Sequence, residues 1–385
     1  MESFLSLARQ IYFSHWNREL AAIVQQKAPC GLLVGGSYAD TPMNVCEAWD
    51  AMLHKVGVNL KTWIVPLEED KGMYSQRGHS CISIEQIRQQ GVPLRFAFAI
   101  PDRTLEAFHT VFRSQGVRTL TLSSSAYMDS WLGTFFQTLP AQGEVYESLK
   151  DDASREALAG YLRGKSSQSP DEFVYAPEPQ YFLGGWIPKK GDILIDGGAY
   201  DGGTGMDYVL AGADVYSFEM DVKNYQNCQK RAKDYGFIVE NYGLWSSEGS
   251  MNYITGDAAS SVTNAGDAVG NFISIDRYVE LHHLPRIDYI KLDIEGAELE
   301  ALKGAAKSII KWKPAMALSA YHRPEDTWRL ASYLRSLRPD YEFAFRHYAI
   351  DSEEYLTVSR QKEILRRLGM DLHIETPYEL VMYCR

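Results

Sequence analysis

The chain has 385 residues, of which 45% are hydrophobic and 23% are charged, and its formal net charge is −11. This composition is typical of an ordinary globular protein. The length favours two domains, because single cores tend to divide beyond about 250–300 residues. The acidic balance argues against a general nucleic-acid binder, which usually carries a basic surface, but it is compatible with a cationic small molecule.

The cysteines and the first residues of the chain bear on its compartment. Five scattered cysteines without a C-x-x-C pair favour reduced thiols over a disulfide framework or a zinc site. The sequence does not begin with a basic segment followed by an apolar stretch, so no signal peptide is expected. It also contains no run of 18 apolar residues, so no membrane-spanning helix is expected. We therefore expect a cytoplasmic protein, with a homo-oligomer as one open arrangement.

Residues 1–125 alternate between strand and helix patterns. Strands are predicted at 31–34, 58–65, 94–100 and 118–122, and helices at 44–55 and 104–115. Repeated βα units predict a parallel sheet covered by helices, here a smaller Rossmann-like α/β domain. Its turn from Val34 to Ser37 resembles a degenerate nucleotide-binding turn without G-x-G-x-x-G. A nucleotide-sugar or acceptor site, a dimerisation platform and a scaffold remain open, and the scaffold or interaction role is favoured.

A helical connector is predicted at 126–180, and a second βα series at 181–385. The expected strands of this series are 193–196, 214–219, 237–241, 289–293 and 315–320, and its expected helices are 222–235, 297–311 and 325–337. Two further strand-like runs, 341–347 and 379–383, close the chain. We expect them to form a hairpin-like, partly antiparallel edge on the parallel sheet.

The most informative motif is the glycine turn Asp196-Gly-Gly-Ala-Tyr-Asp-Gly202, which follows a short apolar strand. Its glycines allow the backbone to approach a ligand closely, and such turns bind nucleotide-like ligands at the carboxyl edge of α/β sheets. The next strand ends in Glu219, at the spacing of about 20 residues where a carboxylate binds ribose hydroxyls. The third strand ends in the segment Asn241–Trp245, a polar and aromatic edge suited to an adenine ring.

Acidic residues and a histidine follow the fourth and fifth strands. The fourth leads into Asp293-Ile-Glu295-Gly-Ala-Glu298, and the fifth into Tyr321-His322. Three acids exceed what one helix N-terminus needs, so at least one is expected to act in catalysis or substrate binding. No set of residues has the spacing of metal ligands, although Asp293 and Glu295 could hold Mg²⁺ through their oxygens, which the sequence neither requires nor excludes.

These motifs, and above all Lys291-Leu-Asp-Ile-Glu-Gly-Ala-Glu298, resemble those of FkbM-type S-adenosylmethionine-dependent methyltransferases. The resemblance covers about residues 188–385. It implies a class I methyltransferase sheet with a reversed last strand and O-methylation, often of a sugar or polyketide hydroxyl. Tyr200 departs from the family, in which a small or amide residue is common at this position. The candidate cofactor-binding residues are Asp196, Gly198, Ala199, Tyr200, Gly202, Glu219, Asn241, Trp245 and Asp293.

The expected function is therefore methyl transfer from S-adenosylmethionine to a hydroxyl of a sugar, glycan or related small molecule. Such a hydroxyl has a high pKa and benefits from a general base within hydrogen-bond reach. Our hypothesis assigns this role to His322 or Asp293, with Glu295 orienting the acceptor. Two alternatives remain: a nicotinamide-dependent oxidoreductase, and a cofactor-binding protein without catalysis.

Overall fold

The computed structural model describes residues 2–34, 43–99, 103–121, 125–255, 261–263, 266–351, 359–369 and 375–385. The chain divides into two compact units, each assembled from three segments. Unit 1 comprises 1–136, 159–175 and 347–378, and unit 2 comprises 137–158, 176–346 and 379–385. Within the described ranges, no helix combines the length and apolar character needed to cross a membrane.

Unit 1 is built around a parallel five-stranded sheet in the order β3-β2-β1-β4-β5. Its strands are β1 (Cys30–Leu33), β2 (Leu60–Val65), β3 (Cys81–Ser83), β4 (Phe96–Ala99) and β5 (Arg118–Thr121). Its helices are α1 (Phe4–Phe13), α2 (Trp16–Gln25), α3 (Met43–Lys55), α4 (Lys71–Ser75), α5 (Ile84–Gln90) and α6 (Arg103–Ser114). The predicted Rossmann-like α/β fold is confirmed. The unpredicted strand β3 is too short to display an alternating pattern.

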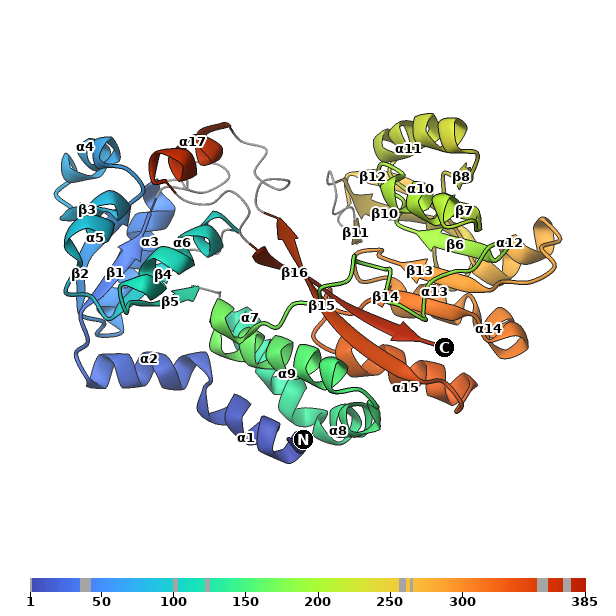
Figure 1. Cartoon of the computed structure of the whole chain (residues 1–385), viewed down its shortest axis with the longest axis horizontal. Coiled ribbons are helices and arrows are strands. Elements are labelled where there is room, and N and C mark those ends of the chain that lie inside the picture. The colour runs from blue at the N-terminus through green and yellow to red at the C-terminus, as the bar shows by residue number, and fades with distance from the viewer. Residues whose placement is uncertain are drawn as a thin grey trace. The chain divides into compact units, whose positions relative to one another are not determined.

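Each face of this sheet has its own apolar core, because successive strand side chains point to opposite faces. One core joins Leu33 to residues of α5 and α6, and the other joins Leu32 to residues of α2 and α3. A late helix, α17 (Ser359–Arg367), contributes Ile364 and Leu365 to the first core, and Figure 1 shows it in red among the blue and cyan elements. The predicted turn at residues 35–37 lies outside the described residues.

Three helices follow β5, namely α7 (Ser125–Gln137), α8 (Leu139–Ser148) and α9 (Asp152–Ser167). Beyond them, unit 2 carries a seven-stranded sheet in the order β15-β16-β14-β13-β6-β7-β8. Its strands are β6 (Ile193–Gly197), β7 (Asp214–Phe218), β8 (Ile238–Glu240), β13 (Tyr289–Leu292), β14 (Ala315–Ser319), β15 (Phe343–Asp351) and β16 (Glu375–Cys384). β16 pairs antiparallel with β14, whereas β6, β7, β8, β13 and β14 pair in parallel. The predicted class I methyltransferase-like sheet with a reversed last strand is confirmed.

The helices of unit 2 are α10 (Gly203–Leu210), α11 (Val222–Tyr235), α12 (Ile275–Leu281), α13 (Glu298–Lys303), α14 (Ala306–Trp312) and α15 (Asp326–Leu337). The single helix predicted at 297–311 is thus divided in two. The break follows Gly304, where an added Cβ would lie 2.1 Å from the carbonyl oxygen of Trp245. The backbone of Trp245 can approach the chain this closely only because residue 304 is glycine.

Two features of unit 2 were not predicted. A small four-stranded sheet, in the order β11-β10-β12-β9, occupies a region for which no strands were expected. Its strands are β9 (Gly243–Leu244), β10 (Gly249–Ile254), β11 (Ser261–Val262) and β12 (Ala268–Ile273). The last two strands form the expected partly antiparallel edge of the main sheet, but a helix that was not predicted, α17, lies between them in the chain.

Candidate active site

The glycine turn after β6 lies directly against the end of β13. Gly198 has φ +77°, and a Cβ at this position would lie 1.8 Å from the carbonyl oxygen of Asp293. A side chain here would be both strained and in collision with backbone. The turn can therefore pack on the acidic segment only because residue 198 is glycine.

A buried ion pair holds the base of this turn. The side chains of Asp196 and Lys291 are 0% and 2% exposed, and their charged atoms lie 3.2 Å apart. Lys291 Nζ also donates to the carbonyl oxygens of Gly197 and Gly198, at 3.2 and 2.9 Å. Burial opposes the charge on Lys291, but the nearby carboxylates outweigh it and raise the pKa of the ammonium. Asp196, which also accepts from Ser217 at 2.8 Å, is thus enclosed in the protein.

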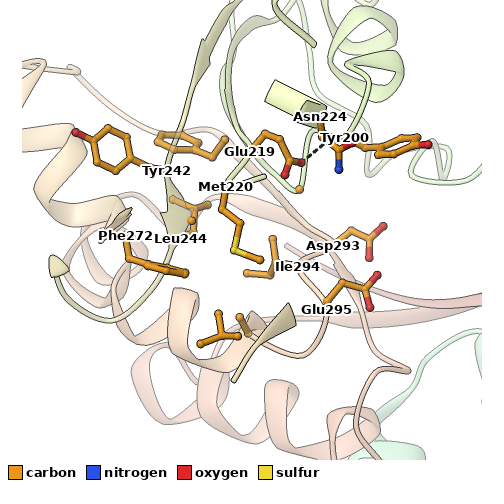
Figure 2. A pocket seen from close by; sticks show the side chains of 15 residues that line it. Tyr200, Glu219, Met220, Asn224, Tyr242, Leu244, Phe272, Asp293, Ile294 and Glu295 are labelled. Atoms are coloured by element: carbon orange, nitrogen blue, oxygen red, sulfur yellow. Dashed lines mark hydrogen bonds between the residues drawn. The ribbon is translucent and has the colours of Figure 1, made fainter. Parts of the chain in front are cut away.

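A pocket opens between the ends of β6, β7 and β13 and the small sheet (Figure 2). The lining residues are Gly198, Tyr200, Phe218, Glu219, Met220, Asn224, Tyr242, Gly243, Leu244, Val262, Phe272, Asp293, Ile294, Glu295 and Ala297. The pocket therefore has apolar walls and three carboxylates.

Glu219 is the most buried of these carboxylates, at 7% exposure. Its two oxygens accept backbone N–H groups, one from Tyr200 at 2.8 Å and one from Asp221 at 2.9 Å. Burial raises the pKa of Glu219 to about 7, despite these hydrogen bonds. Since Tyr200 belongs to the glycine turn, the carboxylate is fixed between the turn and the end of β7.

The apolar wall of the pocket differs from the one expected. Leu244, Tyr242 and Phe272 line it, whereas Asn241 and Trp245 do not. The Asn241 amide instead donates to the carbonyl oxygens of Glu219 and Met220, and the Trp245 ring packs edge-on against Phe272 at 6.0 Å. Phe272 lies on β12, in which exposed and buried residues alternate from Val269 to Phe272.

The remaining turn residues divide between the pocket and its support. Gly198 and Tyr200 line the pocket. The backbone of Ala199 donates to Phe218 at 3.1 Å, and Gly202 precedes α10 with φ +84°, close to Cys228. Ala199 and Gly202 therefore shape the turn without lining the pocket.

The acidic segment after β13 meets the histidine that follows β14. His322 Nε2 lies 3.5 Å from an oxygen of Asp293 and 3.5 Å from an oxygen of Glu295. On its other side, Nδ1 lies 2.9 Å from Oε1 of Glu298. Burial lowers the pKa of the imidazole, but the carboxylates of Glu295, Glu298 and Asp293 outweigh burial and raise it to about 11. All three predicted catalytic residues are thus brought together, although only Asp293 and Glu295 line the pocket.

Sequence reasoning missed two residues behind this cluster. The hydroxyl oxygen of Tyr181 lies 3.0 Å from Asp293 Oδ2 and 2.8 Å from Glu379 Oε2. Burial and the negative charge of Asp293 raise the pKa of Glu379. Tyr181 precedes β6 and Glu379 lies on β16, and no local motif marks either residue.

Comparisons with known proteins agree with this geometry. Residues 196–347 match the model of the methyltransferase FkbM domain. The hexuronic acid methyltransferase AglP of Haloferax volcanii is 28% identical over 127 residues, which cover 31% of this chain and 53% of that protein. The matched part thus spans about half the length of this curated relative. The crystal structure of methyltransferase FkbM from Methylobacillus flagellatus KT aligns over 99% of this chain and 98% of its own, at 21% identity and a TM-score of 0.65.

Proposed function

We propose that this chain, whose residues 196–347 match the methyltransferase FkbM domain, transfers a methyl group from S-adenosylmethionine to a sugar hydroxyl. The observation that carries the proposal is one pocket lined by Glu219, Asp293 and Glu295. We assign the nucleoside to the part of the pocket beside Glu219 and the acceptor to the part beside Asp293 and Glu295.

S-adenosylmethionine is the proposed cofactor. Glu219 follows the glycine turn at the position where adenosine-binding sheets place a carboxylate for ribose hydroxyls. Leu244 and Phe272 line the same pocket and offer apolar surface for the adenine ring. The carboxylates at the pocket edge favour a cationic sulfonium.

The proposed reaction is an in-line displacement. A lone pair of the acceptor oxygen attacks the methyl carbon, the carbon–sulfur bond breaks, and its electrons remain on sulfur, which becomes a neutral thioether. The hydroxyl proton passes to Asp293, which lines the pocket, rather than to His322, which does not. Glu295 orients the acceptor through hydrogen bonds, so that much of the rate enhancement comes from positioning.

A uronic acid or related sugar is the proposed acceptor class. The name of the Haloferax volcanii relative supports it, and neighbouring sugar hydroxyls suit two adjacent carboxylates as hydrogen-bond acceptors. The proposed acceptor is either a small sugar or a sugar unit of a glycan. No nucleic acid is expected as a substrate, because the chain carries a net charge of −11.

Calorimetric titration with S-adenosylhomocysteine and with NAD tests the cofactor. We expect saturable binding of the first and none of the second; the reverse result would favour a nicotinamide-dependent oxidoreductase. Incubation with methyl-labelled S-adenosylmethionine and a panel of hexuronic acids, neutral sugars and glycans then tests the acceptor. Cofactor binding without label transfer to any of them would favour a non-catalytic cofactor-binding protein.

A further inference from the structure

We infer that Asp293, Glu295 and His322 form a binding site for a divalent transition-metal ion such as Mn²⁺ or Zn²⁺ at the acceptor end of the pocket. One ligand atom from each of the three residues lies within 4.8 Å of the other two. The inference deepens the proposed function, on which it rests, by adding an ion beside the acceptor hydroxyl.

The distances between the three side chains fit shared coordination. His322 Nε2 is 3.5 Å from both carboxylate oxygens. Donor atoms bound at about 2.0–2.2 Å to one metal lie about 3.0–3.5 Å from each other at octahedral or tetrahedral angles. The imidazole nitrogen is therefore equidistant from two oxygens at a separation that suits a metal between them.

Unsatisfied atoms provide a second, independent observation. The His322 side chain is only 7% exposed, and among the described residues neither its Nε2 nor Oδ1 of Asp293 has a hydrogen-bond partner. Buried polar atoms are nearly always hydrogen-bonded or bound to an ion or water. An ion would satisfy both atoms at once.

The neighbours of the ligands have the arrangement expected of a metal centre. Glu298 is fully buried and accepts the Nδ1–H of His322 at 2.9 Å, which turns Nε2 toward Asp293 and Glu295. Carboxylate–histidine–metal arrangements of this kind fix the tautomer and the ring orientation. Tyr181 contacts the second oxygen of Asp293 at 3.0 Å. Glu298 thus orients His322, and Tyr181 orients Asp293.

The donor set and its exposure indicate the kind of ion and its role. Mixed imidazole and carboxylate donors suit Mn²⁺, Fe²⁺ or Zn²⁺, whereas Mg²⁺ prefers oxygen alone. Asp293 and Glu295 border the pocket, which leaves coordination positions open on that side, as in catalytic sites. A bound ion would lower the pKa of the acceptor hydroxyl.

Titration of the chelator-treated full chain with Mn²⁺ tests the site, with free Mn²⁺ followed by electron paramagnetic resonance. We expect one saturable site, weakened at least about 100-fold in Glu295→Gln and His322→Gln. Two matched controls, Glu300→Gln in the neighbouring helix and the exposed His283→Gln, are expected to bind as the original chain does. Competition by Zn²⁺ is expected, with far weaker competition by Mg²⁺.

Absence of saturable Mn²⁺ and Zn²⁺ binding, or unchanged binding in both ligand variants, would overturn the metal site. S-adenosylhomocysteine binding, measured on the same samples, reports whether each variant is folded and separates the two proposals. Nucleoside binding without metal binding would reject the metal site and remain consistent with the proposed function. Metal binding without nucleoside binding leaves the metal site standing and contradicts the proposed function.

Discussion

The hydroxyl oxygen of Tyr181 lies 3.0 Å from Oδ2 of Asp293, although 112 residues separate the two in sequence. The same hydroxyl lies 2.8 Å from the buried carboxylate of Glu379. These two contacts join Tyr181 and the two acids in one network behind the pocket. In the proposed function, Tyr181 is therefore a positioning residue, which acts through Asp293 rather than on a substrate.

Replacement of Tyr181 by phenylalanine removes this contact while keeping the ring. A hydrogen bond to a charged group contributes about 1.5–3 kcal/mol, so kcat is expected to fall about 10- to 100-fold. The Kd for S-adenosylhomocysteine should remain unchanged, because Tyr181 does not line the pocket. Steady-state kinetics and calorimetry measure the two quantities. Tyr235→Phe, on an exposed ring, serves as the control, and an equal loss in both variants would contradict the assignment.

Replacement of Gly198 by alanine tests the packing of the turn. The new Cβ would meet the Asp293 carbonyl oxygen at 1.8 Å, so the turn must move away from β13. Gly236 is a matched control, since it has φ +82° but nothing within 4 Å of an added Cβ. Gly236→Ala should cost about 1–2 kcal/mol of unfolding free energy from backbone strain alone.

Gly198→Ala should cost at least about 2 kcal/mol more than this control, as expected for an overpacked core position. It should also abolish binding of S-adenosylhomocysteine. Urea denaturation gives the unfolding free energies, and calorimetry gives the binding. Equal destabilisation of the two variants would show that the turn does not depend on contact with Asp293.

Replacement of Lys291 by methionine leaves the buried Asp196 carboxylate without its counter-ion. Removing one partner of a buried pair costs about 3–5 kcal/mol, and we expect this loss in unfolding free energy. The double variant Asp196→Asn, Lys291→Met should recover part of it, because no uncompensated charge remains. Lys303→Met, which breaks a half-exposed pair with Glu300, should cost less than about 1 kcal/mol. Additive losses in the double variant would argue against coupling.

The pKa of about 7 at Glu219 predicts pH-dependent cofactor binding. In the proposed function, the ionised carboxylate accepts the ribose hydroxyls, and it is protonated as the pH falls below 7. The Kd for S-adenosylhomocysteine should therefore rise about tenfold from pH 8 to pH 6. Glu219→Gln should bind more weakly and without this dependence. A variant that retains the full pH slope would assign the titration to another group.

The raised pKa of Glu219 also affects the stability of the fold, which falls as the pH rises, whereas cofactor binding becomes stronger. Since the pKa of Glu219 in the folded protein lies above the ordinary value of 4.5, the folded protein binds more protons than the unfolded chain between pH 4.5 and 7. The contribution of Glu219 to stability is thus fully present below pH 4.5 and is lost as the pH rises through 7. Urea denaturation of the ligand-free chain should show Glu219→Gln gaining stability relative to the original chain over that range.

The sequence by itself determined the sheet and the residues along one of its edges. Apolar runs broken by glycine and acidic residues predicted the strands before Gly198, Glu219 and Asp293, with small errors at their ends. Because parallel strands end at the same edge of a sheet, their terminal residues had to converge. The local sequence pattern was therefore sufficient to place Glu219, Asp293, Glu295 and His322 at this edge of the sheet.

Only the tertiary structure decided what surrounds those residues. Tyr181, Glu379 and Phe272 reach the site from a loop before β6, from the reversed strand and from the unpredicted small sheet. It also placed Asp196 opposite Lys291 in the interior rather than in the pocket. These relationships depend on contacts across up to 198 residues of chain. Burial, pairing and pKa at such sites are set by neighbours in space, which periodicity and motif spacing do not specify.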